Sequence, residues 1–145
     1  MKVKTVVVGV DGSECGQRAL EAAIQIADPD GSIHVVSAYD APSAHRVSQV
    51  YASVPEEFKS NIDLLAGPRS VVTEAGAHVT QAGATAIEHF VDNDPASAIL
   101  DVANEVNADL IVVGSRGLGR ASQVVRGSVS TKIAHYSQTD FMVVH

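Results

Sequence analysis

The residues best suited to binding chemistry form a glycine-rich segment toward the C-terminal end of the chain. Two residues separate Gly114 from Gly117, and after nine further residues comes the pair Gly127-Ser128. Glycines let backbone N–H groups approach a ligand without a Cβ in the way. Where Ser128 enters a helix, the free N–H groups and the helix dipole favour an anion. The spacing therefore predicts a binding site for phosphate groups.

Charge favours the same interpretation. Residues 114–132 contain four of the ten basic residues of the chain and no acidic residue, although the net charge is −7. A local positive patch on an acidic protein is what phosphate recognition needs. The alternative is a solvent-exposed loop with incidental arginines. The negative net charge argues against general binding of nucleic acid or anionic membranes, which takes clustered Lys and Arg.

Five apolar runs are predicted to form the strands that hold this segment in place. The first is β-branched and mostly apolar on both faces, which is typical of a strand buried in a parallel sheet, and the fourth is another run of this kind. Aromatic residues make up only 4% of the chain, so the core must be built from Val, Ile, Leu and Ala. The predicted strands are Val3–Val10, Ile33–Tyr39, Ala84–Val91, Ala108–Val113 and Phe141–Val144.

Apolar residues at helical spacing follow the first, third and fourth of these strands, and a loop is predicted after the second. The first helix is predicted to stop at Asp28–Gly31, residues 40–55 to form a loop, and Gly67-Pro68 to break or kink the next helix. Asp94-Pro95 is typical of an N-cap followed by the first helical position. The last helix is expected at about Val124–Tyr136. The alternation predicts one α/β domain over residues 1–145, a parallel sheet flanked by helices.

In such a sheet, ligands bind beyond the C-terminal ends of the strands, where the strand order reverses. Two loops at that edge stand out. One follows the first strand and contains Gly9, Asp11 and Gly12; the other begins at Gly114. Asp11 could serve only as a turn residue and helix cap, but its place at a strand end facing the second loop favours ligand contact.

The combined pattern resembles the universal stress protein family, in its ATP-binding branch. The resemblance rests first on the motif Gly-x2-Gly-x9-Gly-Ser, whose first glycine, Gly114, ends the strand sequence Asp109–Ser115. It rests also on the N-terminal strand and turn at Val8–Ser13 and on the entry to the fourth strand at Ala108–Leu110. It covers essentially the whole chain. It implies a five-stranded Rossmann-like sheet of the adenine nucleotide alpha hydrolase type, in the order 3-2-1-4-5.

The resemblance also implies roles for single residues. Asp11 is expected at the ribose or adenine, and the backbone around Ala38 at the adenine. The phosphates are expected in a cradle that Ser130 adjoins. The site residues implied are Gly9, Asp11, Ala38, Gly114, Arg116, Gly117, Leu118, Gly127, Ser128, Val129 and Ser130. The ligand is expected to be ATP, or AMP or ADP, with Mg²⁺ or Mn²⁺ bound through the phosphates.

The function that the resemblance implies is that of a nucleotide-dependent regulator or sensor in stress response. Hydrolysis is expected to be slow at most, because no water-activating base or catalytic lysine is identified near the loop. The alternatives are an adenine-nucleotide-processing enzyme of the related hydrolase-like fold and a nucleotide-free protein-interaction module. The apolar last strand is expected to pair across a homodimer, although Ser137–Asp140 stands where relatives often carry a proline-rich segment.

Several other classes of function lack their sequence signals. The chain has no Gly-x4-Gly-Lys-Ser/Thr motif, no dinucleotide-binding fingerprint and no nucleophile with a matching base. Its six histidines follow no metal-ligand spacing, and its one cysteine, Cys15, allows no internal disulfide. No apolar run is long enough for a signal peptide or a membrane span, so we expect a cytoplasmic protein without membrane contact.

Overall fold

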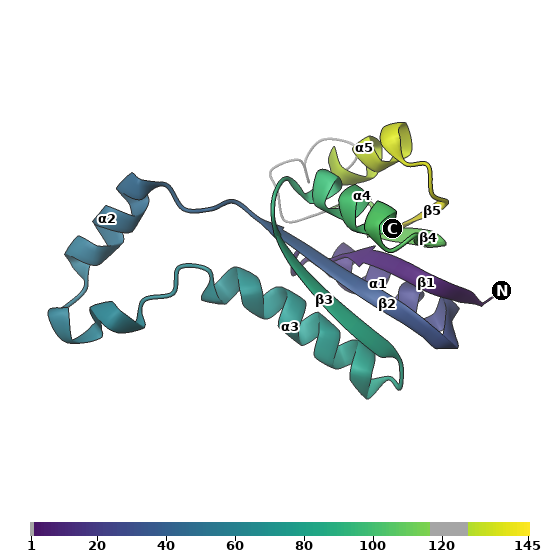
Figure 1. Ribbon diagram of the computed structural model, residues 1–145, viewed down its shortest axis with the longest axis horizontal. Coiled ribbons are helices and arrows are strands. Elements are labelled where there is room, and N and C mark those ends of the chain that lie inside the picture. The colour runs from purple at the N-terminus through teal and green to yellow at the C-terminus, as the bar shows by residue number, and fades with distance from the viewer. Residues whose placement is uncertain (1, 117–127) are drawn as a thin grey trace.

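The computed structural model describes residues 2–116 and 128–145 and contains one five-stranded sheet (Figure 1). The strands lie in the order β3-β2-β1-β4-β5, and every neighbouring pair is parallel. Both the predicted parallel sheet and its order are confirmed. The strands are β1 (Val3–Gly9), β2 (Ala27–Tyr39), β3 (Thr85–Asp92), β4 (Leu110–Gly114) and β5 (Phe141–Val144).

Helices cover both faces of the sheet, as predicted. Helices α1 and α3 pack on one face, and α4 and α5 pack on the other. Helix α2 and a short 3₁₀ helix, η1, lie apart from the sheet (Figure 1). The helices are α1 (Glu14–Ile26), α2 (Ala44–Ser53), η1 (Glu56–Asn61), α3 (Ala66–Gln81), α4 (Pro95–Glu105) and α5 (Ser128–Tyr136).

The core consists of two aliphatic layers, one on each face. On β1, Val6 and Val8 belong to the layer under α1 and α3, whereas Val7 belongs to the layer under α4 and α5. All three are fully buried. Successive side chains of a strand point to opposite faces, so a strand covered on both sides is apolar throughout. This is why the strands of this chain could be recognised as continuous apolar runs.

The start of β2 differs from the prediction. Helix α1 does end before Asp28, but β2 begins at Ala27 instead of Ile33. The pairing of β1 with β2 shifts between Val3 and Thr5. A Cβ at Gly31 would lie 2.4 Å from the Lys4 carbonyl oxygen. The residues expected to form a turn therefore form an irregular first part of the strand, in which glycine permits close approach.

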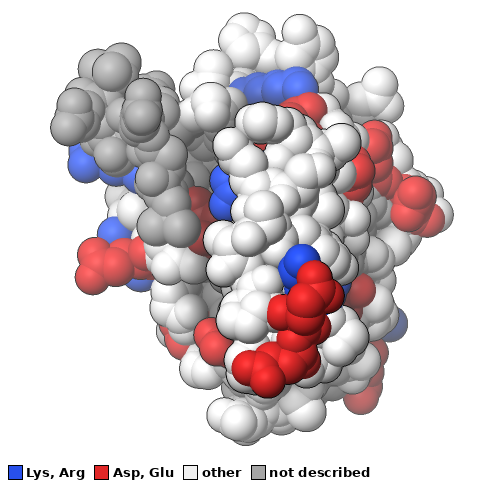
Figure 2. All heavy atoms as spheres, turned by 90° about the vertical axis from the view of Figure 1, so that its left-hand side faces the viewer, with Lys and Arg blue, Asp and Glu red and all other residues white. Residues whose placement is uncertain are grey.

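The loop predicted for residues 40–55 is wrong over most of its length, because α2 occupies Ala44–Ser53. The Ser43 hydroxyl caps this helix by accepting a hydrogen bond from the Arg46 N–H at 3.2 Å. No residue of α2 is buried. Its apolar residues Val47, Val50 and Tyr51 do recur at helical spacing, a short signal that the prediction of a loop overlooked. Figure 2 views the molecule from this side, and acidic and basic side chains are interspersed across it.

The expected break at Gly67-Pro68 is also wrong. Both residues lie in the first turn of α3, which continues without interruption to Gln81. The N–H groups of a first helical turn have no partner within the helix, so proline loses no hydrogen bond there. The two helical pieces, η1 and α3, are instead separated at residues 62–65.

Candidate functional site

The loops at the C-terminal ends of the central strands enclose a pocket that contains six of the predicted site residues. These six are Gly9, Asp11, Ala38, Gly114, Arg116 and Val129. The other lining residues are Val10, Gly16, Val36, Pro95, Ile99 and Val113. Strand β1 lies between β2 and β4, so the pocket sits where successive connections run to opposite sides of β1, as the rule for ligand sites in α/β sheets requires.

Of the remaining predicted site residues, the two in the described part of the chain, Ser128 and Ser130, do not line this pocket. Ser128 is exposed at the start of α5, and Ser130 is buried in the same helix. Gly117, Leu118 and Gly127 lie outside the described residues. The pocket therefore unites the residues predicted at β1, β2 and the end of β4 with one residue of α5.

Asp11 builds the turn between β1 and α1 and also lines the pocket. Its Oδ1 accepts a hydrogen bond from the Ser13 backbone N–H at 2.9 Å and one from the Ser13 hydroxyl. Ser13 in turn caps α1, because its Oγ accepts from the Gly16 N–H at 3.1 Å. Gly12 completes the turn with a φ of 85°, a conformation that favours glycine. Asp11 thus has the structural role considered from the sequence, and its ligand contact stays a prediction.

Gly16 is a pocket residue that the sequence analysis missed. A Cβ at this position would lie 3.1 Å from the Asp11 Oδ1 and 3.3 Å from the Ser13 Oγ. Glycine in a helix weakens it by roughly 1 kcal/mol relative to alanine, so a glycine in the first turn of α1 is a signal of close packing. That signal could have identified Gly16 beside the predicted Asp11.

The apolar wall of the pocket was only partly visible in the sequence. Val36 could have been found from Ala38, because residues two apart on a strand share a face and both line the pocket. Pro95 and Ile99 come from α4. Ile99 lies close to β1 at Gly9, where a Cβ would lie 2.5 Å from the Ile99 Cδ1.

Gly114 serves packing in addition to lining the pocket. A Cβ at Gly114 would lie 2.8 Å from the backbone carbonyl and from the Cβ of Cys15 in α1. This contact brings the first turn of α1 against the end of β4. The sequence analysis explained Gly114 by ligand access alone, and the close approach of α1 is a second reason for glycine.

Cys15 lies beside the pocket without lining it. Its thiol is half-buried, its Sγ accepts a hydrogen bond from Arg18 at 3.3 Å, and it lies 3.9 Å from the Ser115 hydroxyl. Partial burial raises the pKa of this thiol, but hydrogen bonds with Ser115 and Arg18 outweigh it, so the pKa is lowered. Cys15 is therefore a small, half-buried residue beside the site.

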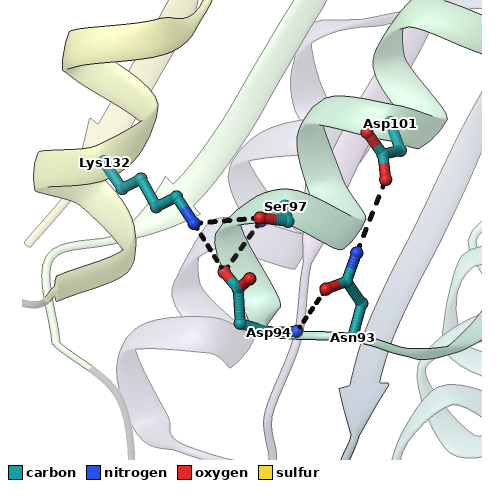
Figure 3. Close-up of polar contacts among 5 residues, drawn as sticks. All are labelled: Asn93, Asp94, Ser97, Asp101 and Lys132. Carbon is teal, nitrogen blue, oxygen red and sulfur yellow. Dashed lines mark hydrogen bonds and ion pairs between the residues drawn. The ribbon is translucent and has the colours of Figure 1, made fainter.

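The N-terminus of α4 forms the polar rim next to Pro95 (Figure 3). Asp94 caps α4 by accepting from the Ser97 N–H at 3.1 Å. The Lys132 Nζ donates to the Asp94 Oδ2 at 3.1 Å and to the Ser97 Oγ at 2.9 Å. Hydrogen bonds from Ser97, and then the Lys132 ammonium, lower the pKa of Asp94 to about 2. The predicted N-cap and proline at the start of this helix are confirmed.

The chemistry of the pocket is divided between an apolar wall and two charged groups. Val36, Ala38 and Ile99 contribute apolar surface, whereas Asp11 and Arg116 contribute a carboxylate and a guanidinium. A flat apolar ring fits the wall, hydroxyl groups suit a carboxylate acceptor, and a guanidinium favours an anion. The residues present therefore fit a ligand that combines a flat base, hydroxyls and an anionic group.

Residues 2–145 match the Universal stress protein family. The chain belongs to this family. The universal stress protein Rv1636 of Mycobacterium tuberculosis strain H37Rv is 32% identical over 143 residues, which cover 98% of this chain and 96% of the relative. The family assignment made from the sequence is thus confirmed, and the chain is a stress-response protein of this family.

Solved structures support the fold of this universal stress protein. A crystal structure of a universal stress protein in complex with cAMP is 32% identical and has a TM-score of 0.71, covering 100% of this chain and 98% of that one. The universal stress protein of Archaeoglobus fulgidus in complex with dAMP covers 100% of both chains at 23% identity, with a TM-score of 0.67. At that lower identity the likeness shows the fold alone.

The part of the chain that the structure describes contains neither a metal-binding cluster nor a candidate membrane-spanning helix. Within residues 2–116 and 128–145, no group of three or more His, Cys, Asp or Glu side chains could hold a metal ion. In the same ranges of this universal stress protein, none of the helices combines the length and the apolar character needed to cross a membrane.

Proposed function

We propose that this universal stress protein binds ATP in the pocket beside β1 and acts as a nucleotide-dependent regulator or sensor in stress response. The observation that carries the proposal is the convergence in one pocket of Asp11, Ala38, Gly114 and Arg116. Each of these residues is also a site residue expected from the sequence. A relative of 32% identity crystallised in complex with cAMP gives independent support for an adenine nucleotide.

The lining residues give each part of the nucleotide a matching surface. The adenine ring would lie against Val36 and Ala38, and the ribose hydroxyls would donate to Asp11. The phosphates would extend toward Arg116 and Gly114. From the sequence we add the phosphate contacts proposed for Gly117, Leu118, Gly127, Ser128 and Ser130. A bound Mg²⁺ or Mn²⁺ would neutralise phosphate charge, with the phosphates as its main ligands.

ATP is expected to act here as a signal and not as a substrate that turns over rapidly. Among the described lining residues, Asp11 is the only carboxylate, and its Oδ1 accepts two hydrogen bonds from Ser13. This arrangement stabilises a turn and gives no support for a base that activates water. A single-turnover assay separates the two roles, because a rate near a typical enzyme value of ~10 s⁻¹ would favour an enzyme.

Ligand identity is the first experiment. Mass spectrometry of the small molecules released from the purified protein is expected to detect an adenine nucleotide. Calorimetric titrations with ATP, ADP, AMP and cAMP then rank the ligands. If no adenine nucleotide co-purifies and none binds in titration, the proposal is wrong and a nucleotide-free interaction module becomes the better hypothesis.

A pair of arginine variants tests whether the pocket is the binding site. Arg116 lines the pocket, whereas Arg46 is an exposed residue of α2 that does not. R116Q removes one charge-assisted contact to phosphate and is expected to weaken ATP binding about tenfold or more. R46Q removes the same charge elsewhere and should bind like the unmodified protein. Equal affinities for both variants would place the nucleotide elsewhere.

Three further parts of the proposal rest on the sequence. We propose that residues 1–145 act as one domain, that the protein works in the cytoplasm, and that it forms a homodimer through β5. The last of these is supported by the place of β5 at one edge of the sheet and by Phe141, of which 40% is exposed.

A further inference from the structure

A three-residue polar contact joins α5 to the N-terminus of α4. The Lys132 Nζ lies 3.1 Å from the Asp94 Oδ2 and 2.9 Å from the Ser97 Oγ, so one ammonium group donates to two side chains of the same helical turn (Figure 3). Asp94 and Lys132 are 38 residues apart in the sequence. The contact is therefore tertiary, and it fixes two helices that carry different parts of the pocket wall.

Both ends of this contact adjoin residues that line the pocket. Asp94 directly precedes Pro95, and Lys132 follows Val129 by three residues, which puts both on one side of α5. Val129 packs in the same apolar layer as Ile99 and Ile133. The Lys132 contact thus lies beside the apolar contact that brings Val129 to the pocket.

The charges make the contact depend on both partners. The N-terminus of a helix carries a partial positive charge and repels cations, so Lys132 lies next to α4 only because the Asp94 carboxylate is there. Asp94 is held in its ionised form by Ser97 and Lys132, which lower its pKa. Removing either charge therefore removes the ion pair between α5 and the cap of α4, and without the Asp94 charge only the hydrogen bond from Lys132 to Ser97 is left.

We propose that Lys132 and Asp94 are positioning residues of the nucleotide pocket, whose ion pair sets the separation between Pro95 on α4 and Val129 on α5. The inference rests on the proposed function, since it assigns these residues to nucleotide affinity. In this role the ammonium group acts on the wall of the pocket and does not touch the phosphates.

Three variants test this role with little change in shape. K132M keeps the length of the side chain and removes its charge. D94N removes the carboxylate but keeps a good N-cap, because Asn caps helices about as well as Asp. K132R restores a cation. We expect K132M and D94N each to weaken ATP binding by about two- to fivefold, the range of a partly exposed ion pair, while K132R stays close to the unmodified protein.

The double variant and a distant control complete the experiment. K132M combined with D94N should bind no more weakly than either single variant, because both remove the same contact. The control is K59M, which breaks the Lys59–Glu56 ion pair (2.8 Å) in η1 and should leave ATP affinity unchanged. Thermal unfolding of each variant separates a loss of affinity from a general loss of stability.

Each contrary result has a distinct meaning. If D94N binds ATP more tightly while K132M binds more weakly, Lys132 contacts the phosphates directly and the positioning role is wrong. If all variants bind like the unmodified protein, with or without a lower unfolding temperature, the ion pair is purely structural and the inference is also wrong. If the unmodified protein itself binds no nucleotide, the proposed function fails and this inference fails with it.

Discussion

Gly114 lies where the end of β4 meets the first turn of α1, and its missing side chain leaves room for the Cys15 backbone. An alanine Cβ there would lie 2.8 Å from the Cys15 carbonyl carbon and oxygen, closer than real Cβ contacts, so α1 would have to shift. We predict that G114A lowers the free energy of unfolding by about 1–3 kcal/mol. Urea unfolding followed by circular dichroism measures the change.

Gly67 supplies the matched control for that variant. It lies in the first turn of α3, and a Cβ there would meet nothing within 4 Å. G67A should therefore leave stability unchanged or raise it by up to about 1 kcal/mol, because alanine favours the helix. A G114A protein as stable as G67A would show that α1 moves away from β4 at little cost.

Site residues could be predicted where the adjoining sequence shows their place at the end of a strand. Gly9, Asp11 and Gly114 follow apolar strands directly, and loops after parallel strands meet at one edge of the sheet. Pro95 and Ile99 could not be found in this way, because their approach to the pocket is set by how α4 crosses β1. At that crossing the Ile99 Cδ1 would lie 2.5 Å from a Cβ at Gly9, a proximity that no local pattern reveals.

At the scale of elements, a pair of histidines joins β2 to β3 under α4. The His34 Nδ1 and the His89 Nε2 lie 2.9 Å apart and share a hydrogen bond, and the His34 Nε2 lies 3.3 Å from the Ser32 hydroxyl. Burial lowers the pKa of both rings, and the charge of His89 lowers the pKa of His34 further. Glu105 at the end of α4 opposes the shift at His89.

These shifts predict a loss of stability in mild acid. Because both pKa values lie below the unfolded value near 6.5, the unfolded chain binds more protons than the folded one as pH falls through that value. Stability is therefore retained above pH ~6.5 and declines below it, by at most about 1.4 kcal/mol per pH unit for each proton. Urea unfolding at pH values from about 8 to about 5, in steps of roughly one pH unit, gives the free energy of unfolding at each pH and so measures the decline.

Two single variants show whether the buried pair causes this decline. H34Q removes one titrating ring and should flatten the dependence of stability on pH. H45Q removes an exposed ring of α2 and should leave the dependence as it is in the unmodified protein. A decline that persists unchanged in H34Q would exclude the pair as its source.

The elements that could be predicted are those that the core buries. Strand β4 appears as an unbroken apolar run, β1 does so from Val6 to Val8, and α1 and α4 show apolar residues at helical spacing. Helix α2 was missed because its helical spacing is carried by only three apolar residues, Val47, Val50 and Tyr51, and none of its residues is buried. The start of α3 was misjudged because Pro68 was assumed to lie inside a helix, whereas it lies in the first turn.

At the scale of the whole molecule, β5 leaves one edge of the sheet open. The Asp140 and Val144 carbonyls accept hydrogen bonds from Ile111 at 2.9 Å and from Ser115 at 2.8 Å. Backbone polar groups alternate in direction along a strand, so the N–H groups of Phe141 and Val143 point away from β4. An edge strand with free backbone groups and apolar side chains favours pairing with a second chain.

This geometry gives a substitution that breaks a dimer without breaking the sheet. V143P removes an N–H that faces outward, and proline is tolerated at an edge strand where no hydrogen bond within the sheet is lost. We predict that the unmodified protein scatters light with twice the chain mass at micromolar concentration and that V143P scatters as a monomer. V143A, which shortens the same side chain but keeps the N–H, should remain a dimer. V143A keeps the backbone donor that proline replaces with its ring. A dimeric V143P would therefore place the interface away from β5, and a monomeric V143A would assign it to side-chain packing instead of strand pairing.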